Sequence, residues 1–370
     1  MKNPLLFFFL SLFSVLLCEK NHAQVPGINS RFFTQAEGGA YIGFVWPHDP
    51  ALDNLYQGAF PGLHIALSGQ TRGNRPWHHA YNFPEIGVTL LFSHLGYPEV
   101  LGHGFGLMPH ITLPLTRGHG LQLQLRYGVG IGYVTNHYQE PHNMDNQAVS
   151  TPFNIAMNTS LQVSIPLSGA FTLRPGLSIT HFSNGKTRVP NKGLNLPSAK
   201  LELVHHFLPD PVLPPRESEP EDYKPYSMAV YLAAGYSELY PPGGSKYAEF
   251  TLSTTLRRRI SQKVAMGLGS DLFWGFSDRE LLRRQGEEDI PLARLIKPGI
   301  HLSYEQVFSN TSFIIQKGIY LHTTNPEDGI TYNRAGFRHH LDDRWLVNIT
   351  IKTHLFRADY LEWGVGYTIL

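Results

Sequence analysis

The chain has 370 residues, of which 42% are hydrophobic, 12% aromatic and only 16% charged, whereas an ordinary soluble domain has roughly 25% charged residues. Its 30 lysines and arginines nearly balance its 29 aspartates and glutamates. This balance excludes binding of nucleic acid through a large net positive charge, and it excludes an acidic disordered chain. The single cysteine excludes a disulfide scaffold and a zinc-thiolate domain.

Residues 1–23 have the pattern of a secretory signal peptide. After a positively charged start, Leu5–Leu17 is almost wholly apolar, and a polar stretch then ends at Ala23. The apolar run is shorter than the roughly 20 residues of a membrane helix, and Cys18 follows a leucine rather than the small residue of a lipoprotein signal. We therefore predict export and a mature chain of residues 24–370.

From Phe32 onward, apolar residues recur at every second position in segments of about ten residues. In residues 121–133 the odd positions are leucine, isoleucine, valine or tyrosine, and the even positions are glutamine, arginine or glycine. This period is that of a β-strand with one apolar face, which would be the core of a soluble sandwich or the lipid-facing side of a membrane barrel. The length of the strands and the aromatic residues near their ends favour the membrane barrel.

The alternation predicts up to sixteen strands, of which the first two are the weakest, so that fourteen is the alternative. Both numbers are even, as bacterial barrels require. We therefore expect one all-β, antiparallel transmembrane barrel of the outer-membrane type over residues 24–370. The strand candidates lie near residues 38–47, 60–68, 82–95, 100–115, 119–135, 152–166, 169–183, 195–208, 226–238, 247–260, 263–277, 294–308, 311–323, 331–340, 344–357 and 360–370.

The predicted connections alternate in length. Short links follow the even-numbered strands, whereas long links, such as those at 137–150 and 277–292, follow odd-numbered ones. Short periplasmic turns and long outer loops predict this arrangement, with both termini in the periplasm. Residues 209–224 (PDPVLPPRESEPEDYK) are an exception, because this proline-rich acidic segment is long where a short turn is expected; we interpret it as a flexible insertion.

Two polar residues interrupt the apolar row of the strand predicted at 169–183. The odd row continues to His181 and then Ser183, whose Cα atoms would be about 6.6 Å apart along a strand. An imidazole can lean across that gap to a hydroxyl, and a histidine and a serine at the outer leaflet could act as base and nucleophile towards a lipid ester. The simpler interpretation is a polar strand end at the headgroup level, since His-x-Ser is a weak motif.

The residues around this pair, HFSNG at 181–185 and PNKGLN at 190–195, resemble the signature of the lipid A 3-O-deacylase (PagL-like, acyloxyacyl hydrolase) family of outer-membrane barrels. The resemblance covers about residues 170–207. It implies an esterase that removes an ester-linked acyl chain from lipid A of lipopolysaccharide without a metal or cofactor, with His181 as general base and Ser183 as nucleophile. Family members are typically barrels of eight strands, so this chain is about twice the expected length.

The third residue of the family site, a glutamate that orients the histidine, corresponds to Asn195 here. Asn195 shares the parity of the apolar row of the strand predicted at 195–208, so it should lie on the same side as His181. Glu202 has the opposite parity and should face the lumen. An amide can hold an imidazole but cannot stabilise imidazolium by charge; in serine proteases the equivalent exchange costs roughly 10⁴ in rate. We predict that Asn195 is the orienting residue and that activity could be slow, altered or lost.

The loop beside this pair carries further candidates. Lys186, Arg188 and Lys192 could contact the phosphates of lipid A, although an ordinary solvated loop explains them equally well. Asn184 and Gly185 could offer N–H groups to an oxyanion. The expected partners are therefore lipopolysaccharide and the lipid of the outer membrane, and no nucleic acid.

Two other functions also fit the sequence. A barrel of fourteen to sixteen strands could enclose a water-filled lumen, which would suit an outer-membrane channel or transport barrel with a degenerate esterase site. A soluble periplasmic β protein that binds lipid is the third possibility, and the length of the strands argues against it.

Overall fold

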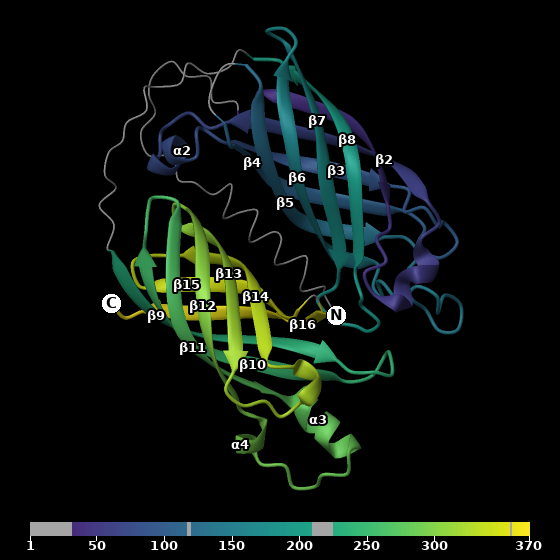
Figure 1. Ribbon diagram of the computed structural model, residues 1–370, viewed down its shortest axis with the longest axis vertical. Helices are drawn as coiled ribbons and strands as arrows, with labels where there is room; N and C mark the ends of the chain where they lie inside the picture. Colours follow the sequence, from purple (N-terminus) through teal and green to yellow (C-terminus); the bar gives the residue numbers. More distant parts are fainter. Residues whose placement is uncertain (1–31, 117–119, 209–224, 356) are drawn as a thin grey trace. The chain divides into compact units, whose positions relative to one another are not determined.

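The computed structural model describes residues 32–116, 120–208, 225–355 and 357–370, which form antiparallel strands with a few short helices (Figure 1). The predicted signal peptide at 1–23 and the segment 209–224 lie outside these ranges. No helix in the described ranges is both long and apolar enough to cross a membrane. The chain divides into two compact units, and we describe each by itself.

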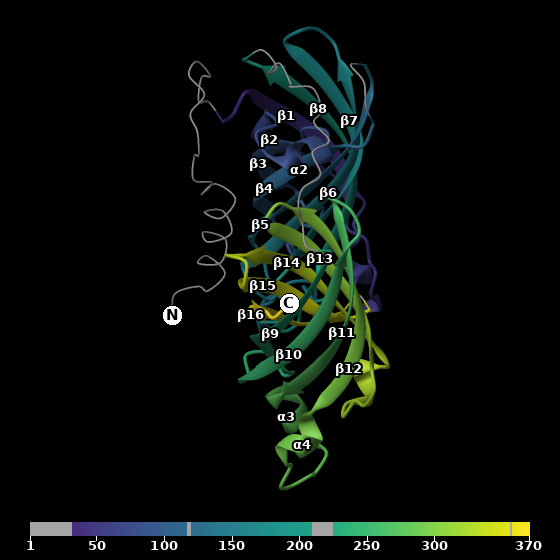
Figure 2. The ribbon, with the colours of Figure 1, turned by 90° about the vertical axis from the view of Figure 1, so that its left-hand side faces the viewer.

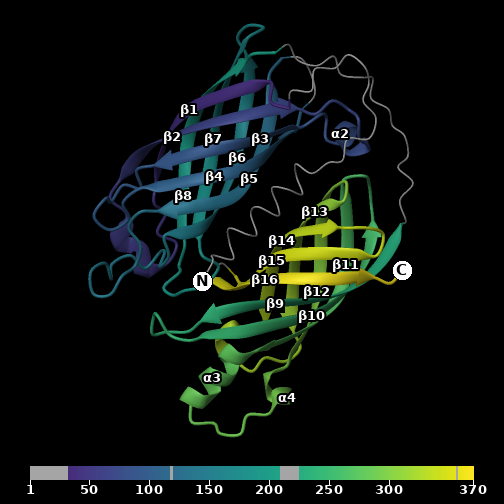
Figure 3. The same cartoon turned by 180° about the vertical axis from the view of Figure 1, so that it is seen from behind.

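All sixteen predicted strands form, but they close into two barrels of eight strands (Figures 1 and 3). The first barrel is sealed by pairing of its first and eighth strands, and the second by pairing of its first and last strands. The prediction of one barrel over 24–370 is therefore wrong, whereas the all-β antiparallel barrel class is confirmed. Alternation specifies which side chains face inward, but it contains no information on which strand pairs with the first to close a sheet.

The first barrel contains the N-terminal strands, which are tilted and twisted as barrel closure requires (Figure 2). A 3-10 helix, η1 (Pro50–Leu55), lies between β1 and β2, and a short helix, α2 (Pro76–Ala80), lies between β2 and β3. The strands are β1 (Gln35–Phe44), β2 (Ala59–Gln70), β3 (Glu85–Ser93), β4 (Gly104–Pro114), β5 (Gln122–Val134), β6 (Phe153–Pro166), β7 (Phe171–Ser183) and β8 (Leu194–His206).

The second barrel repeats this plan with the C-terminal strands. Two helices, α3 (Phe276–Arg284) and α4 (Leu292–Leu295), occupy the connection between β11 and β12, and η2 (Pro326–Asp328) follows β13. The strands are β9 (Tyr226–Glu238), β10 (Lys246–Arg259), β11 (Val264–Gly275), β12 (Lys297–Phe308), β13 (Thr311–Tyr320), β14 (Thr331–His340), β15 (Trp345–His354) and β16 (Arg357–Thr368).

The position of residues 209–224 in the chain resolves the exception among the connections. This segment follows β8, which completes the first barrel, and precedes β9, which begins the second. It therefore joins two barrels rather than two neighbouring strands of one, so the rule that periplasmic hairpin turns are short does not apply to it.

The outside of the first barrel is apolar and its lumen is filled with charged side chains. In β8, Leu201 and Leu203 are exposed on the outside, whereas Glu202 between them is fully buried. Arg126 and Arg174 cross the lumen, and Arg126 pairs with Glu37 at 2.6 Å and with Glu202 at 3.2 Å. An apolar exterior and a polar interior are the reverse of a soluble protein and the rule for a membrane barrel.

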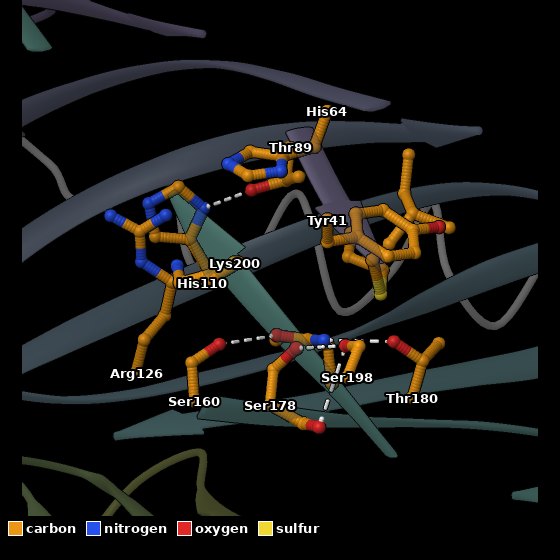
Figure 4. Close-up of a pocket in the computed structure, with 14 residues that line it drawn as sticks. Tyr41, His64, Thr89, His110, Arg126, Ser160, Ser178, Thr180, Ser198 and Lys200 are labelled. Carbon is orange, nitrogen blue, oxygen red and sulfur yellow. Dashed lines mark hydrogen bonds between the residues drawn. The ribbon is translucent and has the colours of Figure 1, made fainter. Parts of the chain in front are cut away.

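The lumen of this barrel contains a small cavity. Figure 4 shows the side chains that line a cavity of about 20 Å³ in the lumen, among them His64, Arg126 and Lys200. A space of this size holds about one water molecule. The lumen of the second barrel is also crossed by buried ion pairs, with Arg334 at 2.7 Å from Glu362 and Arg338 at 2.6 Å from Glu305.

Candidate active site

A buried apolar cluster holds the long connections at one end of the first barrel. Its members come from the connections that follow β1, β3 and β5 and from the adjoining ends of the strands. They include Val45, Leu52, Leu55, Leu95, Val100, Leu101, Ala148, Val149, Phe182, Leu194 and Leu196. Burial of these side chains stabilises the loops by roughly 1.5–3 kcal/mol for each large residue. The polar residues at the ends of β7 and β8 therefore lie next to side chains that are packed in this buried cluster.

His181 and Asn195 are direct partners in the antiparallel pair of β7 and β8. The Nδ1 atom of His181 lies 2.7 Å from the Oδ1 atom of Asn195. Glu202 faces the lumen, where its carboxylate is 2.7 Å from Nε2 of His64. The predicted register of β8 is therefore confirmed: the amide lies beside the imidazole, and the nearest carboxylate of the strand points to the opposite face.

Ser183 is the last residue of β7 and lies opposite Ile155 of β6. It shares the face of His181, since side chains two residues apart in a strand point to the same side. Only 5% of Ser183 is exposed. The next residue, Asn184, is fully buried and donates from Nδ2 to the Ser150 hydroxyl at 3.1 Å. The structure thus brings His181, Ser183 and Asn195 to one end of the β7–β8 pair and holds the chain immediately after Ser183.

Gly193 forms the wall behind the imidazole of His181. Its φ of +80° belongs to the left-handed region, and a Cβ atom there would lie 2.7 Å from Cε1 of His181. Its N–H donates to the carbonyl of Ala148 at 2.8 Å. Only glycine adopts this φ without strain and leaves room for the imidazole ring. The glycine of the sequence signature therefore sets how closely the turn can approach the ring.

His48, which the sequence analysis did not single out, completes the polar group. The Nδ2 atom of Asn195 lies 3.0 Å from Nδ1 of His48, and Nε2 of His48 lies 3.0 Å from the carbonyl oxygen of Lys192. The N–H of Trp46 donates to the Asn195 carbonyl at 2.9 Å, which ties the connection after β1 to β8. His48 and Asn195 are 147 residues apart in the chain, and no local pattern at 46–50 (WPHDP) indicates their contact.

Asp49 fixes the position of the loop that carries His48. It is the N-cap of η1 and accepts a hydrogen bond from the N–H of Ala51 at 3.0 Å. It also accepts from Nζ of Lys192 at 2.6 Å, and this hydrogen bond holds the pKa of the Asp49 carboxyl below its ordinary value. Lys192, which the sequence suggested for a phosphate, is therefore paired with a carboxylate in this structure.

The predicted residues of the loop are divided between the two compact units. Gly185, Lys186 and Arg188 belong to the segment Gly185–Asn191, which forms part of the second compact unit. Of the five residues suggested for substrate or oxyanion binding, Asn184 and Lys192 remain beside the His181 site in the first unit.

A second His-x-Ser sequence shows how much the orientation of a strand matters. His301 and Ser303 in β12 have the same spacing as His181 and Ser183, but they face the lumen of the second barrel and are 2% and 5% exposed. Nδ1 of His301 is 2.7 Å from Oδ2 of Asp271. This pair belongs to the buried polar network of that barrel and not to its lipid-facing surface.

Comparisons with known proteins match both halves of the chain. Residues 62–203 match the family model of lipid A 3-O-deacylase (PagL), and residues 226–370 match the model of the acyloxyacyl hydrolase C-terminal domain. No curated protein sequence matches the chain significantly. Fold and family matches define the class as an ester hydrolase built on outer-membrane β-barrels. Residues 62–203 are thus similar to the lipid A 3-O-deacylase (PagL) family, and the resemblance drawn from residues 181–195 is confirmed.

Two solved structures are similar to about half of the chain. Neisserial surface protein A (NspA) is 10% identical, with a TM-score of 0.32, and the match covers 47% of this chain and 96% of that one. The outer membrane enzyme PagL is 11% identical, with a TM-score of 0.31, and the match covers 48% of this chain and 99% of that one.

Proposed function

We propose that this protein hydrolyses an ester-linked acyl chain of lipid A, with Ser183 as the nucleophile, His181 as the general base and Asn195 as the residue that orients His181. The observation that carries the proposal is the hydrogen bond between Nδ1 of His181 and Oδ1 of Asn195 at the strand end that also holds Ser183. Because Nδ1 is engaged with the amide, Nε2 is the nitrogen available for proton transfer.

The reaction proceeds in two steps through an acyl-enzyme. Oγ of Ser183 bonds to the ester carbonyl carbon while its proton passes to Nε2 of His181; the carbon–oxygen bond to the lipid A alcohol then breaks, and His181 protonates the leaving oxygen. A water molecule next gives its proton to His181 and bonds to the acyl carbon. The bond to Ser183 breaks, the fatty acid leaves, and the proton returns to Oγ of Ser183.

The match of residues 62–203 to the PagL family model supports lipid A as the substrate. The outward face of the strand end supports an acyl ester presented from the membrane rather than from the lumen. A channel is less well supported, because buried arginine–carboxylate pairs cross the first lumen at Arg126 and Arg174 and the second at Arg334 and Arg338. Such pairs are costly to separate and would have to move before solutes could pass.

The experiment that tests the proposal is mass spectrometry of lipid A from cells that express the protein and from cells that do not. We expect a species lighter by one ester-linked acyl chain, together with the free fatty acid. Purified protein in detergent should release the same fatty acid from isolated lipid A. Unchanged lipid A in both experiments, with the barrels assembled, would overturn the proposal.

A further inference from the structure

We propose that His48 is a positioning residue that fixes the orientation of the Asn195 amide and, through it, the tautomer of His181. The inference rests on the proposed function, since it concerns the same site. A glutamate has two equivalent oxygens, so either can accept from the imidazole. An asparagine has one accepting atom and one donating atom of nearly the same shape, and a site that uses it needs a third group to decide which one meets the histidine.

The surroundings of His48 define where its own proton lies. Its Nε2 is 3.0 Å from the carbonyl oxygen of Lys192, which can only accept. Its Nδ1 has two neighbours: Nδ2 of Asn195 at 3.0 Å, which can only donate, and the carbonyl of Trp46 at 3.2 Å. A proton on Nε2 satisfies Lys192 and leaves Nδ1 to accept from Asn195. A proton on Nδ1 would satisfy only the longer contact with the Trp46 carbonyl at 3.2 Å, while it would place two donors against each other and the Nε2 lone pair against the Lys192 carbonyl.

The hydrogen bond between His48 and Asn195 also determines which atom of the amide faces His181. With its nitrogen bound to His48, Asn195 presents Oδ1 to Nδ1 of His181 at 2.7 Å. Because that oxygen can only accept, Nδ1 of His181 carries the proton and Nε2 keeps its lone pair. If the amide were reversed, Nδ1 would accept and Nε2 would hold the proton, and the ring could not remove a proton from Ser183. The chain of hydrogen bonds therefore selects the tautomer that a general base requires.

The backbone holds His48 in place for this task. The N–H of Trp46 donates to the carbonyl of Asn195, so the amide and the loop move together. On the other side of His48, Asp49 caps η1 and pairs with Lys192, the same residue whose carbonyl receives Nε2–H. Leu52 and Leu55 of η1 are both fully buried. These three sets of contacts fix the loop, so His48 can hold the Asn195 amide in the precise position that proton transfer requires.

The first test compares two substitutions in the full-length protein in detergent. His48→Leu removes the acceptor, whereas His48→Gln offers an oxygen to Asn195 and an amide nitrogen to the Lys192 carbonyl. We expect His48→Leu to lower kcat about 10- to 100-fold with KM changed by less than about threefold, because the base is misoriented while the lipid contacts persist. His48→Gln should recover most of that loss. Equal losses in both variants, or none in either, would overturn the inference.

The second test uses the double variant with Asn195→Glu. A carboxylate needs no partner to choose its orientation, so His48→Leu should cause little further loss in that background. A full 10- to 100-fold loss in both backgrounds would mean that His48 acts by supporting the loop and not through the amide. Heat-modifiable gel migration serves to show that each variant has folded.

A third measurement does not depend on activity. In protein labelled with ¹⁵N at histidine, the ring nitrogens of His181, identified by loss of their signals in His181→Gln, should show the Nδ1–H tautomer. His48→Leu should mix this with the Nε2–H tautomer. An unchanged His181 spectrum in His48→Leu would overturn the inference, whereas loss of the tautomer in a protein that leaves lipid A intact would support it and count against the proposed function alone.

Discussion

His181 and Asn195 lie directly opposite each other in the β7–β8 pair, with 2.7 Å between Nδ1 and Oδ1. An imidazole held at Nδ1 by a neutral amide is well oriented, but the imidazolium that the proposed reaction forms would gain no electrostatic stabilisation from its partner. A carboxylate at this position would both orient the histidine and stabilise its positive charge, whereas the Asn195 amide can only orient it.

Ser183→Ala should abolish deacylation while both barrels assemble. The proposed route requires a covalent bond to Oγ of Ser183, and loss of a nucleophile lowers rates by roughly 10³-fold or more. Fatty-acid release from lipid A by the purified variant measures the effect, and heat-modifiable migration checks assembly. Release at the parental rate would show that Ser183 is not the nucleophile. Ser168→Ala, in the turn between β6 and β7 at the other end of the barrel, is the matched control.

Asn195→Ala should lower kcat by letting the imidazole of His181 rotate, whereas Asn195→Glu and Asn195→Asp should raise it by supplying negative charge. The serine-protease precedent sets an upper limit of roughly 10⁴ for the gain. Asn195→Asp is the closest match in size and keeps the reach of Oδ1. Steady-state kinetics on lipid A distinguish the three variants. A carboxylate variant no faster than the alanine variant would show that charge at this position does not assist the reaction.

Gly193→Ala should impair catalysis more than stability. The added Cβ atom would lie 2.7 Å from Cε1 of His181, and the φ of +80° disfavours any side chain. Displacement of the ring by about 1 Å is expected to cost on the order of 10² in rate. Gly169→Ala is the control, because a Cβ atom there has no atom within 4 Å. If both variants retained parental kcat, the turn at Gly193 would not set the position of the base.

Glu202→Gln should destabilise the first barrel without changing the kcat of the folded enzyme. Glu202 faces the lumen, where it pairs with Arg126 at 3.2 Å and Lys200 at 3.3 Å. Loss of one partner from a buried ion pair costs about 3–5 kcal/mol. Denaturant unfolding in detergent measures this loss, and kinetics on the folded fraction test the chemistry. Glu99→Gln, an exposed residue of the β3–β4 connection, should stay within about 0.5 kcal/mol of the parent.

The Asp49–Lys192 contact should open in acid. The hydrogen bond from Lys192 lowers the pKa of Asp49 in the folded protein. Because the pKa of Asp49 is lower in the folded protein than in the unfolded chain, ionised Asp49 stabilises the folded state at a pH above its unfolded pKa of about 3.9. This contribution is lost as the pH falls through the folded pKa. The fluorescence of Trp46, obtained by subtracting the spectrum of Trp46→Phe, should therefore change below about pH 4.

Asp49→Asn should remove this pH dependence, because the amide can still cap η1 but cannot carry the charge. Asp53→Asn, which makes the same charge change at an exposed position of the same helix, should leave the dependence intact. A pH profile identical in the parent and in Asp49→Asn would show that the transition belongs to another group. The contact is partly exposed, so its effect on global stability should be small.

The sequence by itself determined the strands and the faces of their residues. The period of two between Phe32 and Leu370 places sixteen strands correctly, including the two weakest, because alternation follows from backbone geometry that every strand shares. The same parity argument places Asn195 beside His181 and turns Glu202 inward. These are relations between near neighbours in a hairpin, where register and pleat leave little freedom.

The closure of the barrels and the contact between His48 and Asn195 were decided only by the tertiary structure. Local alternation is the same in one barrel of sixteen strands and in two of eight; the difference lies in whether β8 returns to β1, a contact set by twist, tilt and packing across the whole sheet. His48 reaches Asn195 across 147 residues of chain through a loop anchored by Leu52, Leu55 and Asp49. No periodicity records such a contact, because it depends on how separate loops fold together over the end of a closed barrel.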